Sequence, residues 1–390
     1  MSYYNIDETN ARIAKIRGIL KEKNLDAALI YYDQLNIADG WYLTGWCPQF
    51  EKGAVLLPLE GEPVLLGGPE CASFAKMSSA IPTLYCFSAF MVPEEEYPNA
   101  TIYTFERLFN ELAAKGITFK RVGVVGIDYF PYATYVQFQQ GFNGVEMIDI
   151  TDEYDALRYI KSPWEIQNVK KAFSLTWDAY DAMKKKIAPG VTDTEVAAEG
   201  EYACRTKGAN NFAFECMVGS GEISNAVAPV ATNRIMQPGE MVMIGIAPRW
   251  YGYAGVMGDT LPVSGEYTQE QKDVMNVIRE VYRKTRDAIA AGKCGRDIDK
   301  IGAAIYAKHD WTKYIVCPFL HTIGLMEAER PFFGPNGDDE LKPGMTLSVD
   351  ISIFNHPVHH GVRVETGFLL TENGVEALSP EMDAYLSQEL

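Results

Sequence analysis

Four polar residues toward the C-terminal end of the sequence are of types that could perform chemistry together. His321 stands in the segment HTIGLMEAERP, Asp350 in SVDISIF, and both Arg363 and Glu365 in GVRVETGF. In a strand every second side chain points to the same face, so Arg363 and Glu365 share one face of theirs. A histidine beside carboxylates can move protons or bind a metal ion, and an arginine can bind a substrate carboxylate. We favour a catalytic group over a structural ion network, because the residues converge from separated segments.

Further polar residues lie in or near the same segments and are weaker candidates for substrate binding. One of them comes from the loop-like segment FNHPVHHG, whose three histidines are either solvated or include one that serves as a catalytic base. With Arg363, the candidates for substrate binding are Glu327, Glu329, Asp259, Arg249 and His360.

The first part of the chain must form a layered α/β domain. Apolar strand-like pieces such as DAALIYY, GAVLLPL and RVGVVGID alternate with helix-like pieces such as TIYTFERLFNELAAKG. Strands separated by helices predict a parallel or mixed sheet. No turn carries the glycine-rich spacing that cradles a phosphate, so a nucleotide-binding domain is not indicated. We place this N-terminal domain at residues 1–158.

The second part, residues 159–390, reads as two helices, strands, two helices and strands. Its first helix should begin after Ser162 as N-cap, with Pro163 at the first helical position and Glu165 completing a capping box. The repeated order predicts an α+β domain with an antiparallel sheet covered by helices on one face.

Composition limits the possible partners and compartment. The net charge of −17, from 35 basic and 52 acidic residues, argues against binding to nucleic acid or to an anionic membrane. No apolar run is long enough to span a bilayer, and the N-terminus lacks a signal-peptide pattern. The 7 cysteines include no C-x-x-C pair and suggest reduced thiols. We expect a cytoplasmic protein with a small-molecule substrate.

The order of motifs resembles one known superfamily. A GYAG segment, HTIGLMEAERP, LKPGMTLSVD and GVRVETGFLLTENGVEAL follow one another as in the pita-bread superfamily of creatinase, aminopeptidase P and prolidase. LDAALIYYDQLNIADGWYLTG likewise resembles the N-terminal domain of creatinase and prolidase. The resemblance implies an α/β N-terminal domain, a pita-bread C-terminal domain, and a homodimer in which the N-terminal domain lies near the neighbour's active site.

The resemblance also implies metal ligands, and several are missing. Peptidases of this superfamily hold two metal ions with Asp, Asp, His, Glu and Glu. The His falls on His321 and the two Glu on Asp350 and Glu365, but the two Asp fall on Gly245 and Val256. The chain therefore resembles an atypical member that lacks most of the metal ligands.

Two more positions depart from the peptidase pattern. A later histidine of the peptidases falls on Ala328, and an arginine falls on Asp259. Asp259 could replace a lost carboxylate only if its strand shifted by three residues, which would reverse the face to which it points.

Three functions remain open on this basis. The first is a metal-independent, creatinase-like hydrolase that cleaves a C–N bond in a small polar or guanidino compound, with His321, Asp350 and Glu365 as catalytic residues and no cofactor. The second is a mononuclear Xaa-Pro peptidase-like hydrolase or lyase, in which the same three residues hold one Zn, Mn or Fe ion. The third is a non-catalytic binding protein that kept the fold. We favour the first.

Overall fold

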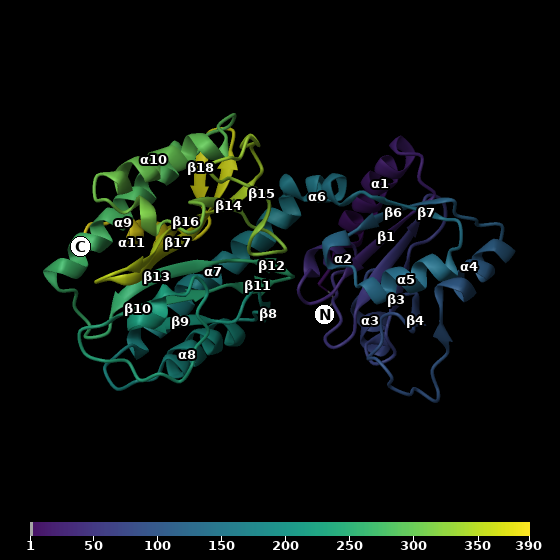
Figure 1. The fold of residues 1–390 in the computed structure, drawn as a ribbon, viewed down its shortest axis with the longest axis horizontal. Helices are drawn as coiled ribbons and strands as arrows, with labels where there is room; N and C mark the ends of the chain where they lie inside the picture. The colour runs from purple at the N-terminus through teal and green to yellow at the C-terminus, as the bar shows by residue number, and fades with distance from the viewer. Residues whose placement is uncertain (1–2) are drawn as a thin grey trace. The chain divides into compact units, whose positions relative to one another are not determined.

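The computed structural model describes residues 3–390, and the chain divides into two compact units between Arg158 and Tyr159. Each unit has its own main sheet (Figure 1). Each also has its own hydrophobic core. The predicted combination of an α/β domain and an α+β domain with an antiparallel sheet is confirmed. Among the helices of residues 3–390, none combines the length and the apolar character that crossing a membrane requires.

The N-terminal unit contains a seven-stranded mixed sheet in the order β5-β4-β3-β2-β1-β6-β7. β1 pairs antiparallel with β2 and parallel with β6, so the sheet combines hairpin and crossover connections. The strands are β1 (Ala27–Tyr32), β2 (Gly53–Pro58), β3 (Val64–Gly67), β4 (Leu84–Phe87), β5 (Ile102–Tyr103), β6 (Arg121–Val125) and β7 (Glu146–Asp149).

The helices of this unit pack around an aromatic core that includes Phe87, Phe105 and Phe138. The helix predicted from TIYTFERLF begins later than its periodicity suggests, because the Thr104 side chain accepts from the Arg107 N–H and caps it there. Ile102 and Tyr103 form the edge strand instead. The helices are α1 (Ile6–Glu22), α2 (Ile37–Thr44), α3 (Ala72–Ser78), α4 (Phe105–Ala114), α5 (Tyr132–Gly141) and α6 (Thr151–Tyr159), with a short 3₁₀ turn η1 (Ile127–Tyr129).

The C-terminal unit is built on an antiparallel sheet in the order β15-β14-β16-β17-β13-β10-β9, with β18 added beside β17. A smaller three-stranded sheet runs in the order β12-β11-β8. The strands are β8 (Asn211–Phe212), β9 (Met217–Ser220), β10 (Met241–Ile246), β11 (Pro248–Trp250), β12 (Tyr253–Ala254), β13 (Met257–Pro262), β14 (Leu320–Thr322), β15 (Glu329–Phe332), β16 (Thr346–His356), β17 (His360–Thr371) and β18 (Gly374–Ala377).

Two helix pairs flank these strands (Figure 1). The predicted capping box of α7 is present: Ser162 accepts from the Glu165 N–H at 3.2 Å, and Glu165 accepts from the Ser162 N–H at 2.8 Å. The helices are α7 (Pro163–Lys186), α8 (Asp193–Thr206), α9 (Gln269–Ala288), α10 (Gly295–Ala307) and α11 (Pro380–Leu386), with 3₁₀ turns η2 (Gly221–Asn225) and η3 (Thr312–Tyr314).

The two faces of the main sheet differ in chemistry. On β16 and β17, the side chains of Val349, Ile351, Val362 and Val364 join the core beneath the helices. The residues between them point to the opposite face, because side chains alternate along a strand. That opposite face carries the polar residues of the candidate site.

Candidate functional site

Three strands of the C-terminal unit bring the side chains of His321, Asp350 and Glu365 together. Asp350 on β16 is directly opposite Glu365 on β17, and His321 on the neighbouring β14 is opposite Ser348. One nitrogen or oxygen atom from each of the three lies within 4.8 Å of the others. The two carboxylates are buried, with residue exposures of 7% for Asp350 and 2% for Glu365. A shared strand register therefore places an imidazole and two carboxylates around one point.

Each of the three side chains is oriented by an outer partner. His321 Nδ1 lies 3.0 Å from the carbonyl oxygen of Thr322, and because a carbonyl only accepts, Nδ1 carries a proton and Nε2 faces the carboxylates. Ser348 Oγ donates to Glu365 Oε1 at 2.7 Å, and Arg363 Nε donates to Asp350 Oδ1 at 3.0 Å. Such outer contacts are typical of metal ligands, whose orientation they fix.

The electrostatics of the group are dominated by buried carboxylates. Burial alone would lower the pKa of His321, but Glu327 and Glu365 beside its Nε2 raise it to about 10. Burial raises the pKa of Glu327 and of Asp350, and Arg363 opposes this at Asp350. The pKa of Glu365 is lowered in spite of burial, by its hydrogen bond with His321 and by the charge of Arg363. The site therefore holds more negative charge than its own cations balance, which favours a bound cation.

This donor set fits one metal ion. One imidazole nitrogen and two carboxylate oxygens are the ligands that catalytic zinc sites use, with a further position left for water or substrate. A second ion has no comparable ligands, because Gly245 and the fully buried Val256 offer no side-chain donor where the resemblance places aspartates. His321, Asp350 and Glu365 would hold the single ion.

The secondary candidates from the second half of the HTIGLMEAERP segment lie in different surroundings. Glu327 belongs to the group, with its Oε1 3.5 Å from His321 Nε2. Glu329 forms a buried ion pair with Lys161, at 2.8 Å between Oε1 and Nζ. Lys161, which directly precedes the Ser162 N-cap of α7, was not among the residues predicted for the site.

Two candidate arginines are engaged within the protein. Arg249 on β11 donates to the carbonyl oxygens of Gly252 and Leu325, which ties its strand to the loop after β14. Arg363 donates to the carbonyl oxygen of Val227 at 2.8 Å in addition to Asp350. In this structure both guanidinium groups donate hydrogen bonds to other groups of the protein.

Asp259 does not lie with the site residues. It pairs with Ile244 across β10 and β13 and points, as Ile244 does, to the helix-covered face of the sheet. The strand shift that would bring it into the site is absent, since Gly245 and Gly258 remain paired. The structure therefore contradicts the expectation that Asp259 binds substrate at this site, because alternation along β13 points its side chain to the opposite face.

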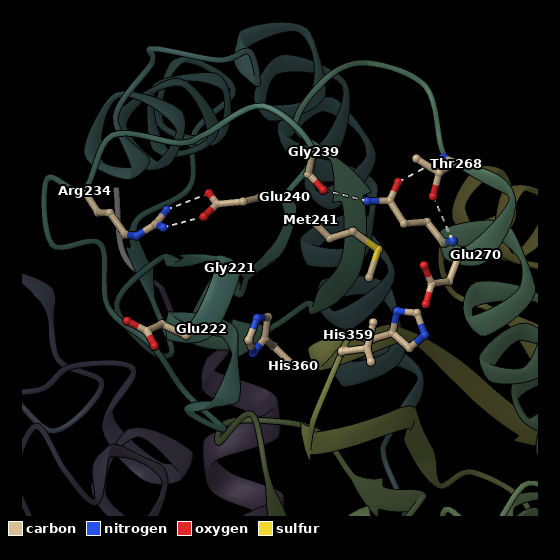
Figure 2. A pocket seen from close by; sticks show the side chains of 12 residues that line it. Gly221, Glu222, Arg234, Gly239, Glu240, Met241, Thr268, Glu270, His359 and His360 are labelled. Atoms are coloured by element: carbon tan, nitrogen blue, oxygen red, sulfur yellow. Dashed lines mark hydrogen bonds and ion pairs between the residues drawn. The ribbon is translucent and has the colours of Figure 1, made fainter.

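His360 is also remote from the group. It is the first residue of β17, so its Cα atom lies roughly 16 Å along the strand from that of Glu365. His359 and His360 line a separate cavity of about 460 Å³ with Glu270 and with the paired Arg234 and Glu240 (Figure 2). The described lining residues of this cavity include neither His321 nor Glu365.

Sequence reasoning missed one residue that shapes the site. Met217 on β9 contacts Arg363, with its Sδ 3.9 Å from Nη1. The available signal was the pair of glycines at 245 and 258, since a strand position without a side chain leaves room that a neighbour must fill.

Comparison with known families assigns both units. Residues 167–372 match metallopeptidase family M24, and residues 12–160 match the creatinase/prolidase N-terminal domain. The first match alone spans more than half of the chain.

Individual relatives agree with this assignment. An Xaa-Pro dipeptidase of Pyrococcus horikoshii is 27% identical over 375 residues, covering 96% of this chain and 98% of that protein. An Xaa-Pro dipeptidase of Pyrococcus furiosus is 27% identical over 83% of this chain and 88% of its own length. The solved prolidase of Pyrococcus horikoshii OT3 superposes with a TM-score of 0.80 at 24% identity, covering 95% of this chain and 98% of that one.

These findings correct two expectations from the sequence. The metal-independent, creatinase-like function is wrong, because the matched family is one of metallopeptidases and its named relatives are Xaa-Pro dipeptidases. The expectation of no cofactor is wrong for the same reason, and because three side chains form a group able to hold a metal ion. The metal-independent interpretation relied on the absence of aspartates at positions 245 and 256. It took too little account of the three possible metal ligands that remain, His321, Asp350 and Glu365.

The prediction of an enzyme that hydrolyses a C–N bond is confirmed at the level of the family. The predicted superfamily is confirmed as well. The chain belongs to metallopeptidase family M24 and carries a creatinase/prolidase N-terminal domain in front of the peptidase domain.

Proposed function

We propose that the protein is a metal-dependent hydrolase that cleaves the C–N bond of short peptides, Xaa-Pro dipeptides among them, with one divalent ion held by His321, Asp350 and Glu365. The observation that carries this proposal is that all three donors converge and that each is held by an outer partner.

The residues around the donors suggest how the reaction proceeds. A divalent ion bound here would polarise the scissile carbonyl and lower the pKa of a water molecule. Glu327, a carboxylate beside His321 that is not one of the three ligands, is placed to take a proton from the attacking water and pass it to the departing nitrogen. Arg363 orients Asp350 through the hydrogen bond from its Nε to Asp350 Oδ1.

The direct test combines metal content with turnover. Protein purified without chelators should contain a divalent metal by elemental analysis and release the amino-terminal residue from Xaa-Pro dipeptides supplied with Mn²⁺ or Zn²⁺. His321→Gln should lose both metal and activity, whereas the exposed His309→Gln serves as the matched control and should keep both. Metal-free protein with full activity, or a His321→Gln variant that retains its metal, would refute the proposal.

We also propose, from the resemblance to creatinase-like proteins, that the protein is a cytoplasmic homodimer whose N-terminal and catalytic domains are residues 1–158 and 159–390. Light scattering after size-exclusion chromatography tests the dimer, and a monomer at micromolar concentration would contradict it.

A further inference from the structure

A single row of paired residues crosses five strands of the main sheet at the candidate site. Asp350 on β16 pairs with Glu365 on β17, and Glu365 pairs with Gly258 on β13. Gly258 pairs with Gly245 on β10, and Gly245 pairs with Met217 on β9. Residues paired directly across strands point to the same face. The row therefore has two carboxylates at one end, two positions without side chains in the middle, and a methionine at the other end.

Two side chains fill the space that the glycines leave. A Cβ atom on Gly245 would lie 2.6 Å from Cε of Met217, so the thioether occupies this position. A Cβ atom on Gly258 would lie 3.2 Å from Cδ of Arg363, so the aliphatic part of the Arg363 side chain occupies the space beside Gly258. The Arg363 guanidinium therefore lies between Asp350 at one end of the row and Met217 at the other. Its Nε donates to Asp350 Oδ1 at 3.0 Å, and its Nη1 lies 3.9 Å from Met217 Sδ.

The charges of the group balance with one divalent ion. When the imidazole is neutral and coordinates the ion, Asp350, Glu365 and Glu327 are negative and Arg363 is positive, which leaves two negative charges to be compensated. One divalent ion compensates both. A second would add buried positive charge beyond what these three carboxylates and Arg363 leave to be compensated, which is strongly unfavourable.

We propose that the guanidinium of Arg363 acts as a fixed positive charge in the place of a second metal ion, and that with Met217 it limits the site to one divalent ion per chain. This inference rests on the proposed function, because it assumes that the first ion binds to His321, Asp350 and Glu365. It differs from a role in which Arg363 only orients Asp350. A fixed cation repels the bound ion and weakens its binding, whereas an orienting residue strengthens it.

Metal stoichiometry of the full-length protein provides the first test. Protein stripped with a chelator is titrated with Zn²⁺ and, separately, with Mn²⁺, and the bound ions are counted by calorimetry and elemental analysis. One ion per chain is expected. Two ions would overturn this inference and leave the proposed function intact, whereas no binding of either ion would overturn both.

Affinity of the variants provides the second test. Arg363→Met should bind Zn²⁺ at least about tenfold more tightly than the unmodified protein in competition with a chromophoric chelator, because a buried repulsion is removed. Arg363→Lys keeps the charge and should stay within about threefold of the unmodified protein, as should Arg296→Met, which removes an exposed arginine from α10. Should Arg363→Met not fold, as judged by near-UV circular dichroism, Arg363→Gln removes the same charge. Weaker binding in both the Met (or Gln) and the Lys variants would show that Arg363 only positions Asp350 and would overturn the inference.

Discussion

At the scale of single residues, the protonation of His321 decides whether the site is ready for a metal ion. Its Nδ1 proton is committed to the Thr322 carbonyl, so Nε2 is the atom available to a metal. Burial disfavours a charged imidazole, but Glu327 and Glu365 together raise the pKa of His321 to about 10. Near neutral pH without an ion, Nε2 is therefore protonated and forms ion pairs with both carboxylates. A metal ion must displace this proton to bind.

The displaced proton makes metal affinity depend on pH. We expect the apparent affinity for Zn²⁺ to rise about tenfold per pH unit between roughly pH 7.5 and pH 9, because the pKa of His321 lies above this range and each binding event releases one proton. Calorimetry in buffers of different ionisation enthalpy would measure the released proton directly. An affinity independent of pH over this range would show that His321 is not a ligand or is already neutral.

The Ser348 hydroxyl, which donates to Glu365, should also affect the affinity for the metal ion. Ser348→Ala removes the hydrogen bond to Glu365 Oε1, and losing such an outer contact typically weakens metal binding about tenfold to a hundredfold. Ser352→Ala is the matched control, since Ser352 is buried four positions further along the same strand and its side chain has no hydrogen bond among the described contacts of the site. Chelator competition measures both variants. Equal losses in the two would indicate a general effect on β16 rather than on Glu365.

At the scale of elements, the main sheet separates two buried charged groups by placing them on opposite faces. Asp259 on β13 faces the helices, is fully buried, and neither carboxylate oxygen has a hydrogen-bond partner in the described structure. Burial raises the pKa of Asp259 to about 6, although Arg279 on α9 opposes the shift. Because the folded-state pKa exceeds the unfolded value of about 3.9, the native state binds the proton more tightly. Asp259 therefore favours folding most at low pH, and this contribution is lost as the pH rises toward 6 and above.

Replacing Asp259 should remove this pH dependence. We expect the free energy of unfolding of the unmodified protein, relative to Asp259→Asn, to fall by about 1 to 1.5 kcal/mol between roughly pH 5 and pH 7.5. The exposed Asp339→Asn is the matched control and should show no such trend. Urea unfolding at several pH values gives the free energies. A difference that stays constant or grows with pH would mean that Asp259 is ionised without penalty.

At the scale of the whole molecule, local patterns in the sequence predicted the helices and strands better than the contacts between side chains of different strands. Alternation in GVRVETGF correctly placed Arg363 and Glu365 on one face of their strand, away from the core residues Val362 and Val364, and the Ser162 capping box marked the start of α7. The convergence of His321 with Asp350 and Glu365 was expected, but the register of the three strands that produces it cannot be read from the pattern within single segments. The filling of the row by Met217 and Arg363 could not be predicted, because it depends on how neighbouring side chains pack where glycines leave room.

Because the three donors belong to the C-terminal unit, a bound metal ion should stabilise that unit in particular. A ligand at about a hundredfold excess over its dissociation constant adds about 2.7 kcal/mol to the free energy of unfolding, which corresponds to a rise in Tm of roughly 5 to 10 °C for a unit of this size. Calorimetric scans with Zn²⁺ and with a chelator should differ by this amount in at least one transition. Glu365→Gln should abolish the difference, whereas the exposed Glu372→Gln should retain it. If the two transitions separate and only one responds, the units unfold independently; a shift that persists in Glu365→Gln would place the ion elsewhere than at His321, Asp350 and Glu365.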